Sequence, residues 1–571
     1  MSHAGPGRGW CSSLLLSFVL SVVAPRAFGA LPAELPLSDL LPINGADGSQ
    51  GFLFRGSTAF GHLANNSAVA PAGDVNNDGV DDFVVGASSE AGVYVVFGRA
   101  DGFAPEVSAR SLLPPEGDGS RGFLVAETAP SARLGEAVAG ADLNGDGISD
   151  VVILDSSVGE NDRGAVYVIY GRDTPAGDRF PPIIGEIDLL PENGGDGSAG
   201  FVLTPSPDVP ARHALGVGDL NGDGLDDLAI DGRYVVYGRN GNAGDDFPAE
   251  FMLDALFPAS GGDGSRGFVI LPPGEETFFG SSIVNMAGDY NHDGIDDLLI
   301  GSQQGTPFNR QEAGFVYLLY GSADPPPAFP PLFQLSSLFA AGGGDGSAGV
   351  VFIGADADDR AAIVSHTDDI NGDGIDDMII GAPGGSIGRR TPGSGEAYVV
   401  YGRDGLGLNP FQAEERLETI RQPGPNGERL GFSIVGISAG DFAGIASRGG
   451  DLNGDGLGDV SLGSFRAGNL GEGGEVYLIY GRDTGLVGEF PSVFRTRGLT
   501  EAQGGNGEQG VVFVAVRAED DAGFSIGLGD VNGDGVEDFA IAAPGLEREE
   551  PFQQSPGAVF VIYGQAQEGA R

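Results

Sequence analysis

The sequence predicts an all-β protein, a seven-bladed β-propeller with four-stranded antiparallel blades. An Asp-rich segment of nine residues recurs seven times along the 571 residues, and short β-rich runs follow each copy. Helical periodicity is nearly absent, since only Gln412–Arg421 could form a turn or two. A closed ring of blades leaves no exposed end, whereas an open solenoid would need polar capping repeats that neither terminal copy resembles.

Residues 1–29 have the features of a secretory signal peptide. An apolar stretch runs from Cys11 to Ala24, and small residues stand at Ala27 and Gly29. We expect cleavage near Gly29, which leaves residues 30–571 as a single propeller domain that is secreted or periplasmic. Cleavage also removes the one cysteine, so disulfides cannot hold the mature fold together.

The charged residues are strongly unbalanced. Asp and Glu number 81 against 30 cations, all of them Arg, and the formal charge is −51. Such a surface repels nucleic acids and anionic lipids. No apolar run after the signal peptide is long enough to span a membrane, so we expect neither a nucleic-acid partner nor a membrane span.

The repeated segment has the pattern Asp-x-Asn-x-Asp-Gly-x-x-Asp. Side-chain oxygens stand at positions 1, 3, 5 and 9, a carbonyl is available at position 7, and Gly at position 6 permits a sharp turn. Three carboxylates in one short loop repel one another unless a cation lies among them. The seven copies are Asp74–Asp82, Asp142–Asp150, Asp219–Asp227, Asp289–Asp297, Asp369–Asp377, Asp451–Asp459 and Asp530–Asp538.

Hard oxygen donors in a flexible loop favour Ca²⁺, so we expect up to seven structural calcium ions. The alternative, an Asn/Asp turn without a metal, is disfavoured by seven copies with the same donors. An EF-hand is excluded because position 12, where it needs Glu, is an apolar residue such as Val85. The predicted ligands are Asp74, Asn76, Asp78, Val80, Asp82; Asp142, Asn144, Asp146, Ile148, Asp150; Asp219, Asn221, Asp223, Leu225, Asp227; Asp289, Asn291, Asp293, Ile295, Asp297; Asp369, Asn371, Asp373, Ile375, Asp377; Asp451, Asn453, Asp455, Leu457, Asp459; and Asp530, Asn532, Asp534, Val536, Asp538.

The repeats resemble the FG-GAP repeats of the integrin α-subunit headpiece. Phe60-Gly61 and Phe279-Gly280 match the FG pair, Gly381-Ala382-Pro383 and Ala543-Pro544 match the GAP motif, and Asp74–Asp82 matches the calcium hairpin. The resemblance covers nearly all of the chain after the signal peptide. It implies a propeller with Ca²⁺ between the first and second strands of a blade, and an extracellular binding, adhesion or scaffolding module. We expect neither leg domains nor a transmembrane helix, and we therefore do not expect a complete integrin receptor chain.

We expect the protein not to be an enzyme. The alternative is an extracellular hydrolase or lyase with a carboxylate site near the propeller channel, next to a His or an Arg. Gly523–Gly527 matches the G-x-S-x-G pattern of serine hydrolases, but it precedes the seventh loop on an inner strand, where that motif needs a strand-to-helix turn. The His residues after the signal peptide stand at no fixed offset in the repeat, so we expect them on the surface or in loops: His62, His213, His292 and His366.

The two ends of the chain should meet in one blade. The seventh unit ends at its third strand, Val559–Tyr563, while Gly51–Phe54 precedes the first loop with no earlier blade to join. We expect the N-terminal strand to complete the seventh blade and close the ring.

A protein or glycan ligand is predicted on the face opposite the calcium loops. The loops between the second and third strands open there, and they are long in units four, five and seven. Function tends to lie on enlarged loops over a rigid scaffold. Four cations on these loops could bind carboxylate or sulfate groups of a glycan or an acidic peptide, unless they only offset nearby carboxylates: Arg310, Arg389, Arg390 and Arg548.

Overall fold

The computed structural model describes most of residues 31–566. The predicted signal peptide lies outside the described residues. Within the range, the residues not described are 58–62, 65–67, 88–91, 128–132, 160–161, 207–208, 275–283, 287, 307–309, 324–327, 386–392, 406, 408–409, 425–426, 428, 439–440, 465–466, 468–472, 518–519, 550–551 and 554–555.

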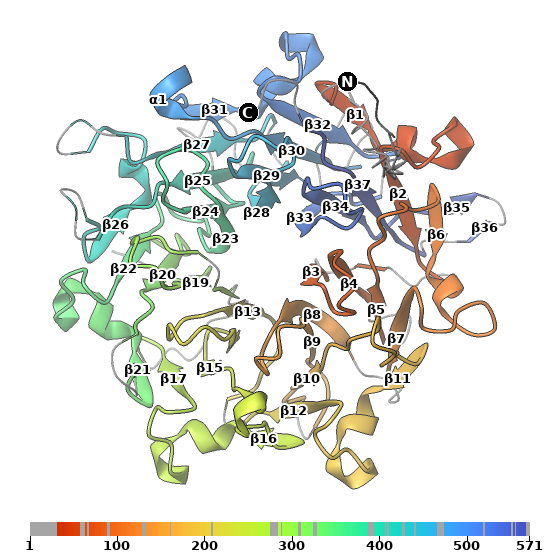
Figure 1. The fold of residues 1–571 in the computed structure, drawn as a ribbon. Helices are drawn as coiled ribbons and strands as arrows, with labels where there is room; N and C mark the ends of the chain where they lie inside the picture. The colour runs from red at the N-terminus through yellow and green to blue at the C-terminus, as the bar shows by residue number, and fades with distance from the viewer. Residues whose placement is uncertain are drawn as a thin grey trace, which may run out of the picture.

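Seven β-sheets are arranged around a central axis, as the repeats predict (Figure 1). In blade 1 the order from the axis outward is β3 (Val69–Gly73), β4 (Asp82–Ala87), β5 (Gly92–Val96), β7 (Gly122–Ala126) and β11 (Ile183–Gly185). The first four strands are antiparallel, and the fifth is parallel to its neighbour. The fold is therefore an all-β, seven-bladed propeller.

The other blades repeat this order. Blade 2 has β8 (Leu134–Ala141), β9 (Asp150–Asp155), β10 (Ala165–Ile169), β12 (Gly200–Thr204) and β16 (Glu250–Met252). Blade 3 has β13 (Leu215–Gly218), β14 (Asp227–Ile230), β15 (Tyr234–Val236), β17 (Gly267–Leu271) and β21 (Leu332–Gln334). Blade 4 has β18 (Val284–Asn285), β19 (Leu298–Ser302), β20 (Phe315–Leu319), β22 (Gly349–Ile353) and β26 (Glu414–Arg416).

The last three blades complete the ring. Blade 5 has β23 (Ile363–Thr367), β24 (Asp377–Ala382), β25 (Glu396–Val400), β27 (Gly431–Val435) and β31 (Val493–Arg495). Blade 6 has β28 (Ile445–Gly450), β29 (Asp459–Ser464), β30 (Glu475–Ile479), β32 (Gly510–Val514) and β1 (Glu34–Pro36). Blade 7 has β33 (Phe524–Gly529), β34 (Asp538–Ala543), β37 (Ala558–Ile562), β2 (Gly51–Arg55) and β6 (Glu106–Ser108).

The prediction of four-stranded blades is wrong, because each blade carries a short fifth strand. This strand belongs to the connection that leads to the outer strand of the following blade, as β11 of blade 1 leads to β12 of blade 2. It covers the edge of the fourth strand, which would otherwise expose unpaired backbone groups. The one segment expected to be helical, Gln412–Arg421, contributes such a strand, β26, followed by a 3-10 turn at Leu417–Thr419.

The predicted ring closure is confirmed. β2 pairs antiparallel with β37 in the register Gly51↔Ile562 to Arg55↔Ala558. The N-terminal segment also supplies β1, which pairs in parallel with β32 of blade 6. Two blades are thus tied by the start of the chain, and no blade is left with an open outer edge.

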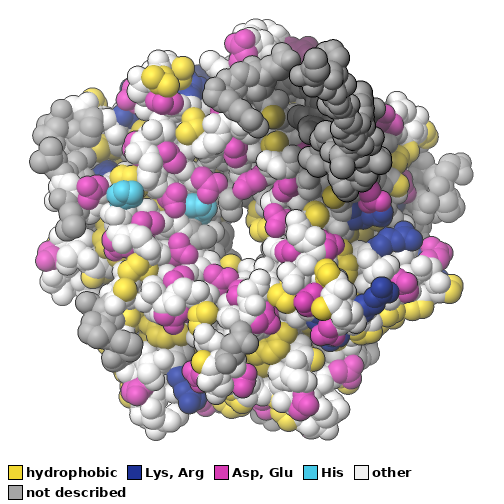
Figure 2. All heavy atoms as spheres, viewed as in Figure 1, with side chains coloured by type: hydrophobic (Ala, Val, Ile, Leu, Met, Phe, Trp, Pro, Cys, Tyr) yellow, Lys and Arg dark blue, Asp and Glu magenta, His cyan; other side chains and the backbone are white. Residues whose placement is uncertain are grey.

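Hydrophobic side chains between neighbouring sheets form the core. One cluster joins Leu35, Phe513 and Phe539 of blades 6 and 7, and another joins Phe54 with Phe83 of blades 7 and 1. Acidic side chains are spread over the surface, including the area around the central opening, and basic ones are few (Figure 2). Among the described residues, no helix is long and apolar enough to cross a membrane.

We predict that Phe54→Ala lowers the free energy of unfolding by about 3–5 kcal/mol, because this side chain is fully buried where the ring closes. Its ring lies 6.0 Å from the rings of both Phe83 and Tyr94. Urea unfolding at constant calcium measures the change. The matched control is Ile43→Ala, since Ile43 belongs to the same segment but is 73% exposed. Equal stability of the two variants would contradict closure by the N-terminal strand.

Candidate metal sites and the opposite face

All seven Asp-rich loops join the first and second strands of their blades, as predicted. The loop of blade 1, for example, lies between β3 and β4, and its ninth residue, Asp82, is the first residue of β4. Because strands alternate in direction, the seven loops open on one face of the ring, together with the connections from third to fourth strands. The connections from second to third strands open on the other face.

Each loop is shaped by hydrogen bonds to its own carboxylates. The carboxylate at position 1 accepts from the N–H groups of positions 5 and 6 in all seven copies; in blade 1 these are Asp78 and Gly79, at 2.9 and 2.7 Å from Asp74. The Gly at position 6 has φ between +84° and +89° in every copy, with open space around it. Backbone conformation alone therefore requires Gly there.

The carboxylate at position 9 is fully buried in every copy. It accepts a hydrogen bond of 2.8–3.0 Å from the Gly N–H that follows the third strand of its own blade, such as Gly98 bonding to Asp82. It also accepts from an N–H near the start of the loop, such as that of Val75 at 3.0 Å. This Asp thus ties the loop to the third strand.

Among the described residues, these carboxylates accept hydrogen bonds from neutral backbone and amide N–H groups and from no cation. Burial raises the pKa of Asp82 well above its usual range; the Gly98 N–H opposes this, and the charges of Asp78 and Asp74 add to it. The six other position-9 residues show the same direction with burial as the main cause. In the described part of the chain, no three carboxylate, imidazole or thiol groups already form a metal shell. The donor set of each loop, and the mutual repulsion of its carboxylates, favour a bound cation.

Neighbouring loops are linked around the whole ring. In all seven blades the residue after that Gly donates its N–H to the position-2 carbonyl of the preceding blade's loop, at 2.8–3.0 Å. Arg172 of blade 2 bonds to Val75 of blade 1 in this way, and Arg99 of blade 1 bonds to Val531 of blade 7. The loops and the third strands therefore form a closed belt of hydrogen bonds on one face.

An acidic residue at position 8, which sequence reasoning did not single out, strengthens this belt. In five blades its carboxylate accepts from the N–H of position 1 in the preceding blade; Asp296, for example, bonds to Asp219 N at 2.9 Å. Blades 2 and 6 have Ser149 and Gly458 at this position, and only their backbone N–H groups reach the preceding loop. The repetition of Asp or Glu at one offset could have revealed this role.

The four arginines predicted to bind a ligand have different settings. Arg310 donates to the carbonyls of Gly354 and Ala355, at 3.0 and 2.5 Å, and pairs with Glu418 at 3.3 Å. Arg310 therefore joins the end of β22 to the turn after β26. Arg389 and Arg390 lie outside the described residues. Arg548 lies in a two-residue strand, β35 (Arg548–Glu549), which pairs with β36 (Phe552–Gln553) at the tip of the loop in blade 7. Their role in binding stays a prediction.

Arg310 is one of the residues that line a polar crevice of about 190 Å³ between blades 4 and 5. Glu396, at the start of β25, pairs there with Arg421 and accepts from the Tyr398 hydroxyl at 3.2 Å. Burial raises the pKa of the nearby Asp359 to about 7, against the opposing hydrogen bond from the Asp356 N–H. The crevice lies on the face opposite the metal loops and away from the innermost strand.

One histidine lies beside a carboxylate on an innermost strand. His366 of β23 has its Nε2 2.9 Å from Asp368, just before the fifth loop, and its side chain is buried against Tyr290. The expectation that the histidines lie on the surface or in loops is wrong for this residue. The G-x-S-x-G segment lies on the innermost strand β33, as predicted.

Comparisons with known proteins agree with the repeats. The model of the FG-GAP repeat matches residues 134–169, 283–319, 361–400 and 522–562, which contain the first three strands of blades 2, 4, 5 and 7. Integrin alpha-PS5 of Drosophila melanogaster is 31% identical over 189 residues, 33% of this chain and 15% of that protein. Phosphatidylinositol-glycan-specific phospholipase D of Mus musculus is 32% identical over 136 residues, 24% of this chain and 14% of that protein.

A third relative and one solved structure complete the comparison. Integrin alpha pat-2 of Caenorhabditis elegans is 30% identical over 194 residues, 30% of this chain and 14% of that protein. The chain thus spans about a seventh of the length of these relatives. A solved structure of BBS1N in complex with ARL6DN covers 91% of the chain, with 8% identity and a TM-score of 0.38, a likeness too low to bear on function.

We predict that Asp296→Ala lowers the free energy of unfolding by about 1–3 kcal/mol, because it leaves Asp219 N without its partner in the neighbouring blade. Urea unfolding at fixed calcium measures this. The control is Glu192→Ala, which removes an exposed carboxylate from an outer turn. If both variants have the stability of the unmodified protein, the acid at position 8 does not link the blades.

The raised pKa of Asp359 predicts a pH dependence of stability. The folded state keeps this carboxyl protonated up to about pH 7, whereas the unfolded chain ionises near its ordinary value of 3.8, so stability falls as the pH rises between them. Asp359→Asn should remove about 1–3 kcal/mol of this fall, seen as a difference in unfolding free energy between pH 4 and pH 7. The exposed Asp245 provides the control variant Asp245→Asn, whose profile should follow that of the unmodified protein.

Proposed function

Because the chain carries FG-GAP repeats and resembles integrin α-subunits, we propose that it is a secreted, calcium-loaded propeller that binds a ligand on the face opposite its metal loops. One observation carries the proposal: all seven loops keep the same five donor positions on the same hydrogen-bonded scaffold. The function is that of a binding, adhesion or scaffolding module rather than an enzyme.

The donor set fits calcium. Each loop offers three carboxylates, one amide oxygen and one carbonyl oxygen, and oxygen ligands of this kind suit a hard cation with six to eight ligands. In blade 3 the ion would be held by Asp219, Asn221, Asp223, the Leu225 carbonyl and Asp227. Bound calcium supplies positive charge, and the buried Asp227 has no cation of the protein as a hydrogen-bond partner. The carboxylates that repel one another in the empty loop would then stabilise it.

The opposite face is the more variable one, because the repeated Asp-rich loops lie on the other side of the ring. Its long loops follow the second strands of blades 4, 5 and 7, and blade 3 has only the turn Asp231–Arg233 at this place. Variable loops on a repeated scaffold are the usual place of binding sites. Export follows from the predicted signal peptide, and calcium at the concentration of an extracellular medium would keep the loops loaded.

The alternative of a hydrolase or lyase has two supporting observations. Asp359 and Glu396 place two buried carboxyl groups in one crevice with Arg421, and a carboxyl group with a pKa near 7 suits acid–base catalysis. Phosphatidylinositol-glycan-specific phospholipase D is an enzyme that shares similarity with part of this chain. The crevice is small, however, and Arg310, one of the residues that line it, is held by three contacts within the protein. The binding module therefore remains the better supported function.

We predict that the mature chain binds up to seven calcium ions and that Asp223→Ala removes one of them. Each site that binds only the folded state adds about 2.7 kcal/mol at a hundredfold excess of calcium over its dissociation constant. Excess chelator should therefore lower the melting temperature strongly. Calcium analysis of the dialysed protein measures the stoichiometry, and calorimetry measures the melting temperature.

The control for this experiment is Asp245→Ala, which removes an exposed carboxylate of the same blade outside the loop. It should keep the full calcium content. Melting that is the same in chelator and in millimolar calcium, or an Asp223→Ala protein with an unchanged calcium content, would refute the calcium proposal.

A further inference from the structure

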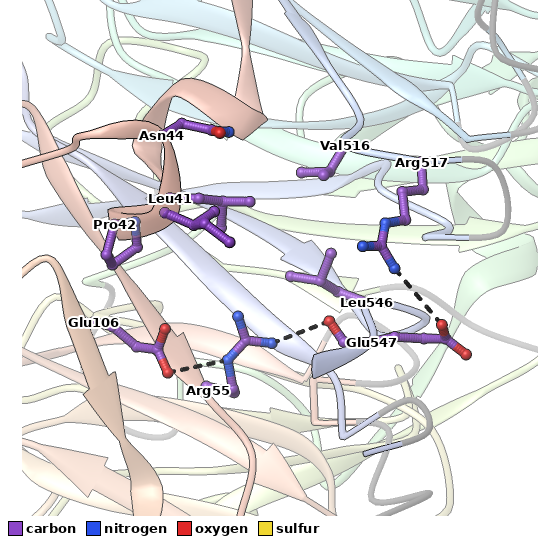
Figure 3. Close-up of a pocket in the computed structure, with 10 residues that line it drawn as sticks. Leu41, Pro42, Asn44, Arg55, Glu106, Val516, Arg517, Leu546 and Glu547 are labelled. Carbon is purple, nitrogen blue, oxygen red and sulfur yellow. Dashed lines mark hydrogen bonds and ion pairs between the residues drawn. The ribbon is translucent and has the colours of Figure 1, made fainter. Parts of the chain in front are cut away.

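One cavity lies where the ring closes, on the face opposite the metal loops. This closure pocket has a volume of about 480 Å³, within the range of small-molecule sites. Its walls come from four places: the turns after β1, the outer strands β2 and β6, the residues after β32, and the loop after β34. Figure 3 shows the side chains that line it.

A row of four charged residues forms one side of the closure pocket (Figure 3). Glu106 pairs with Arg55 at 3.3 Å, Arg55 donates to the Glu547 carbonyl at 3.4 Å, and Arg517 lies 3.7 Å from the Glu547 carboxylate. Arg55 is buried, with a side chain only 7% exposed, whereas the side chains of Arg517 and Glu547 are each 38% exposed. The pocket therefore presents hydrogen-bond donors and acceptors alternately.

Aliphatic side chains form the rest of the lining. Leu41 and Pro42 project from the N-terminal turns, and Val516 and Leu546 come from blades 6 and 7 (Figure 3). Leu546 is buried, so this apolar wall is fixed by the core beneath it. A ligand here would meet an apolar surface on one side and paired charges on the other.

A crevice at the equivalent place between blades 4 and 5 is smaller than the closure pocket, and the two linings can be compared residue by residue. Ala355 and Val516 each stand two residues after a fourth strand, and Arg421 and Leu41 each stand five residues after a fifth strand. Between blades 4 and 5, Arg310 reaches across to the Ala355 carbonyl, and the crevice shrinks to about 190 Å³. The closure pocket has Leu41 where that crevice has the charged Arg421, and its volume is correspondingly larger.

From this lining we propose that the closure pocket binds a neutral saccharide. The two guanidinium groups and two carboxylates cancel, so neither an anion nor a cation gains net attraction, and the chain's charge of −51 repels acidic ligands. Sugar hydroxyls donate to carboxylates and accept from guanidinium groups without displacing either charge. The C–H face of a sugar ring packs on aliphatic side chains such as Val516. This inference rests on the proposed binding function and names its ligand class.

The test uses the calcium-loaded mature chain and a panel of neutral mono- and disaccharides built from glucose, galactose, mannose and N-acetylglucosamine. Glucuronic acid and a sulfated oligosaccharide serve as charged comparators. Saturation-transfer NMR detects binding, and calorimetry gives the Kd. We expect at least one neutral sugar to bind, with the charged comparators weaker. Arg517→Ala and Glu547→Ala should each weaken that binding by about tenfold or more, because each removes a charge-assisted hydrogen bond.

The matched control is Arg360→Ala, which removes another exposed arginine of the same face that is paired with a glutamate, Glu312, at 2.9 Å. It should bind the sugar as the unmodified protein does, and melting temperatures check that all variants fold. The proposal is overturned if no neutral sugar binds, if charged comparators bind more tightly, or if Arg517→Ala and Glu547→Ala leave the Kd unchanged.

The calcium content of the same samples separates this proposal from the proposed function. A chain that holds its calcium and binds no sugar overturns the saccharide site alone. A chain that binds a neutral sugar through Arg517 without holding calcium supports the site and overturns the calcium-loaded scaffold.

Discussion

The architecture depends on one buried carboxylate per blade, the Asp at position 9 of the loop. It holds the N–H at the end of the third strand and an N–H at the start of the loop at the same time, as Asp377 holds Gly402 and Ile370. The next residue, Arg403, is thereby placed to bond to the Tyr290 carbonyl of the preceding blade. A charge buried in this way is expensive unless it is compensated. A cation in each loop would turn the main electrostatic cost of the fold into the interaction that orders it.

A second constraint acts at the outer edge of each blade, where backbone groups need hydrogen-bond partners. A four-stranded blade would expose the backbone of its last strand, and the three-residue fifth strands cover that edge in parallel. In five blades the segment that supplies the cover also carries a Phe stacked on a Phe of the fourth strand, such as Phe247 on Phe201 at 4.0 Å. Arg239, next to the belt of hydrogen bonds, lies over the same Phe247 ring at 4.2 Å. The belt of hydrogen bonds and the cover of blade 2 are therefore linked through the side chain of Arg239.

Much of this could be predicted from sequence, because the repeat exposes what local chemistry requires. The place of the loops between the first and second strands, the Gly at position 6 and the closing strand Gly51–Phe54 all follow from residue type and offset. The fifth strands were missed because three residues beside prolines give no periodic signal, although a Phe followed nine residues later by a Leu precedes the fourth strand in five of the seven blades, as in Phe180 to Leu189. The link through Asp296 depends on a contact between neighbouring blades, which no single repeat contains. Arg310 bonds to residues that stand 44 to 108 positions later in the chain, a separation that local sequence does not reveal.

The two faces of the ring differ because the repeat is regular on one face and varies on the other. On the face of the Asp-rich loops the blades share the same bonds, except for the position-8 carboxylate that blades 2 and 6 lack, so that face can be rigid but offers seven nearly identical surfaces. On the opposite face the loops differ, and the place where the chain closes differs most, because an N-terminal segment replaces the turn that the preceding repeat would supply. The closure pocket, lined by the buried Arg55 and Leu546, lies where the N-terminal strands β1 and β2 join blades 6 and 7. A repeat protein that must recognise one particular ligand gains specificity where its repeat is broken, and a rigid belt on the other face keeps that place in shape.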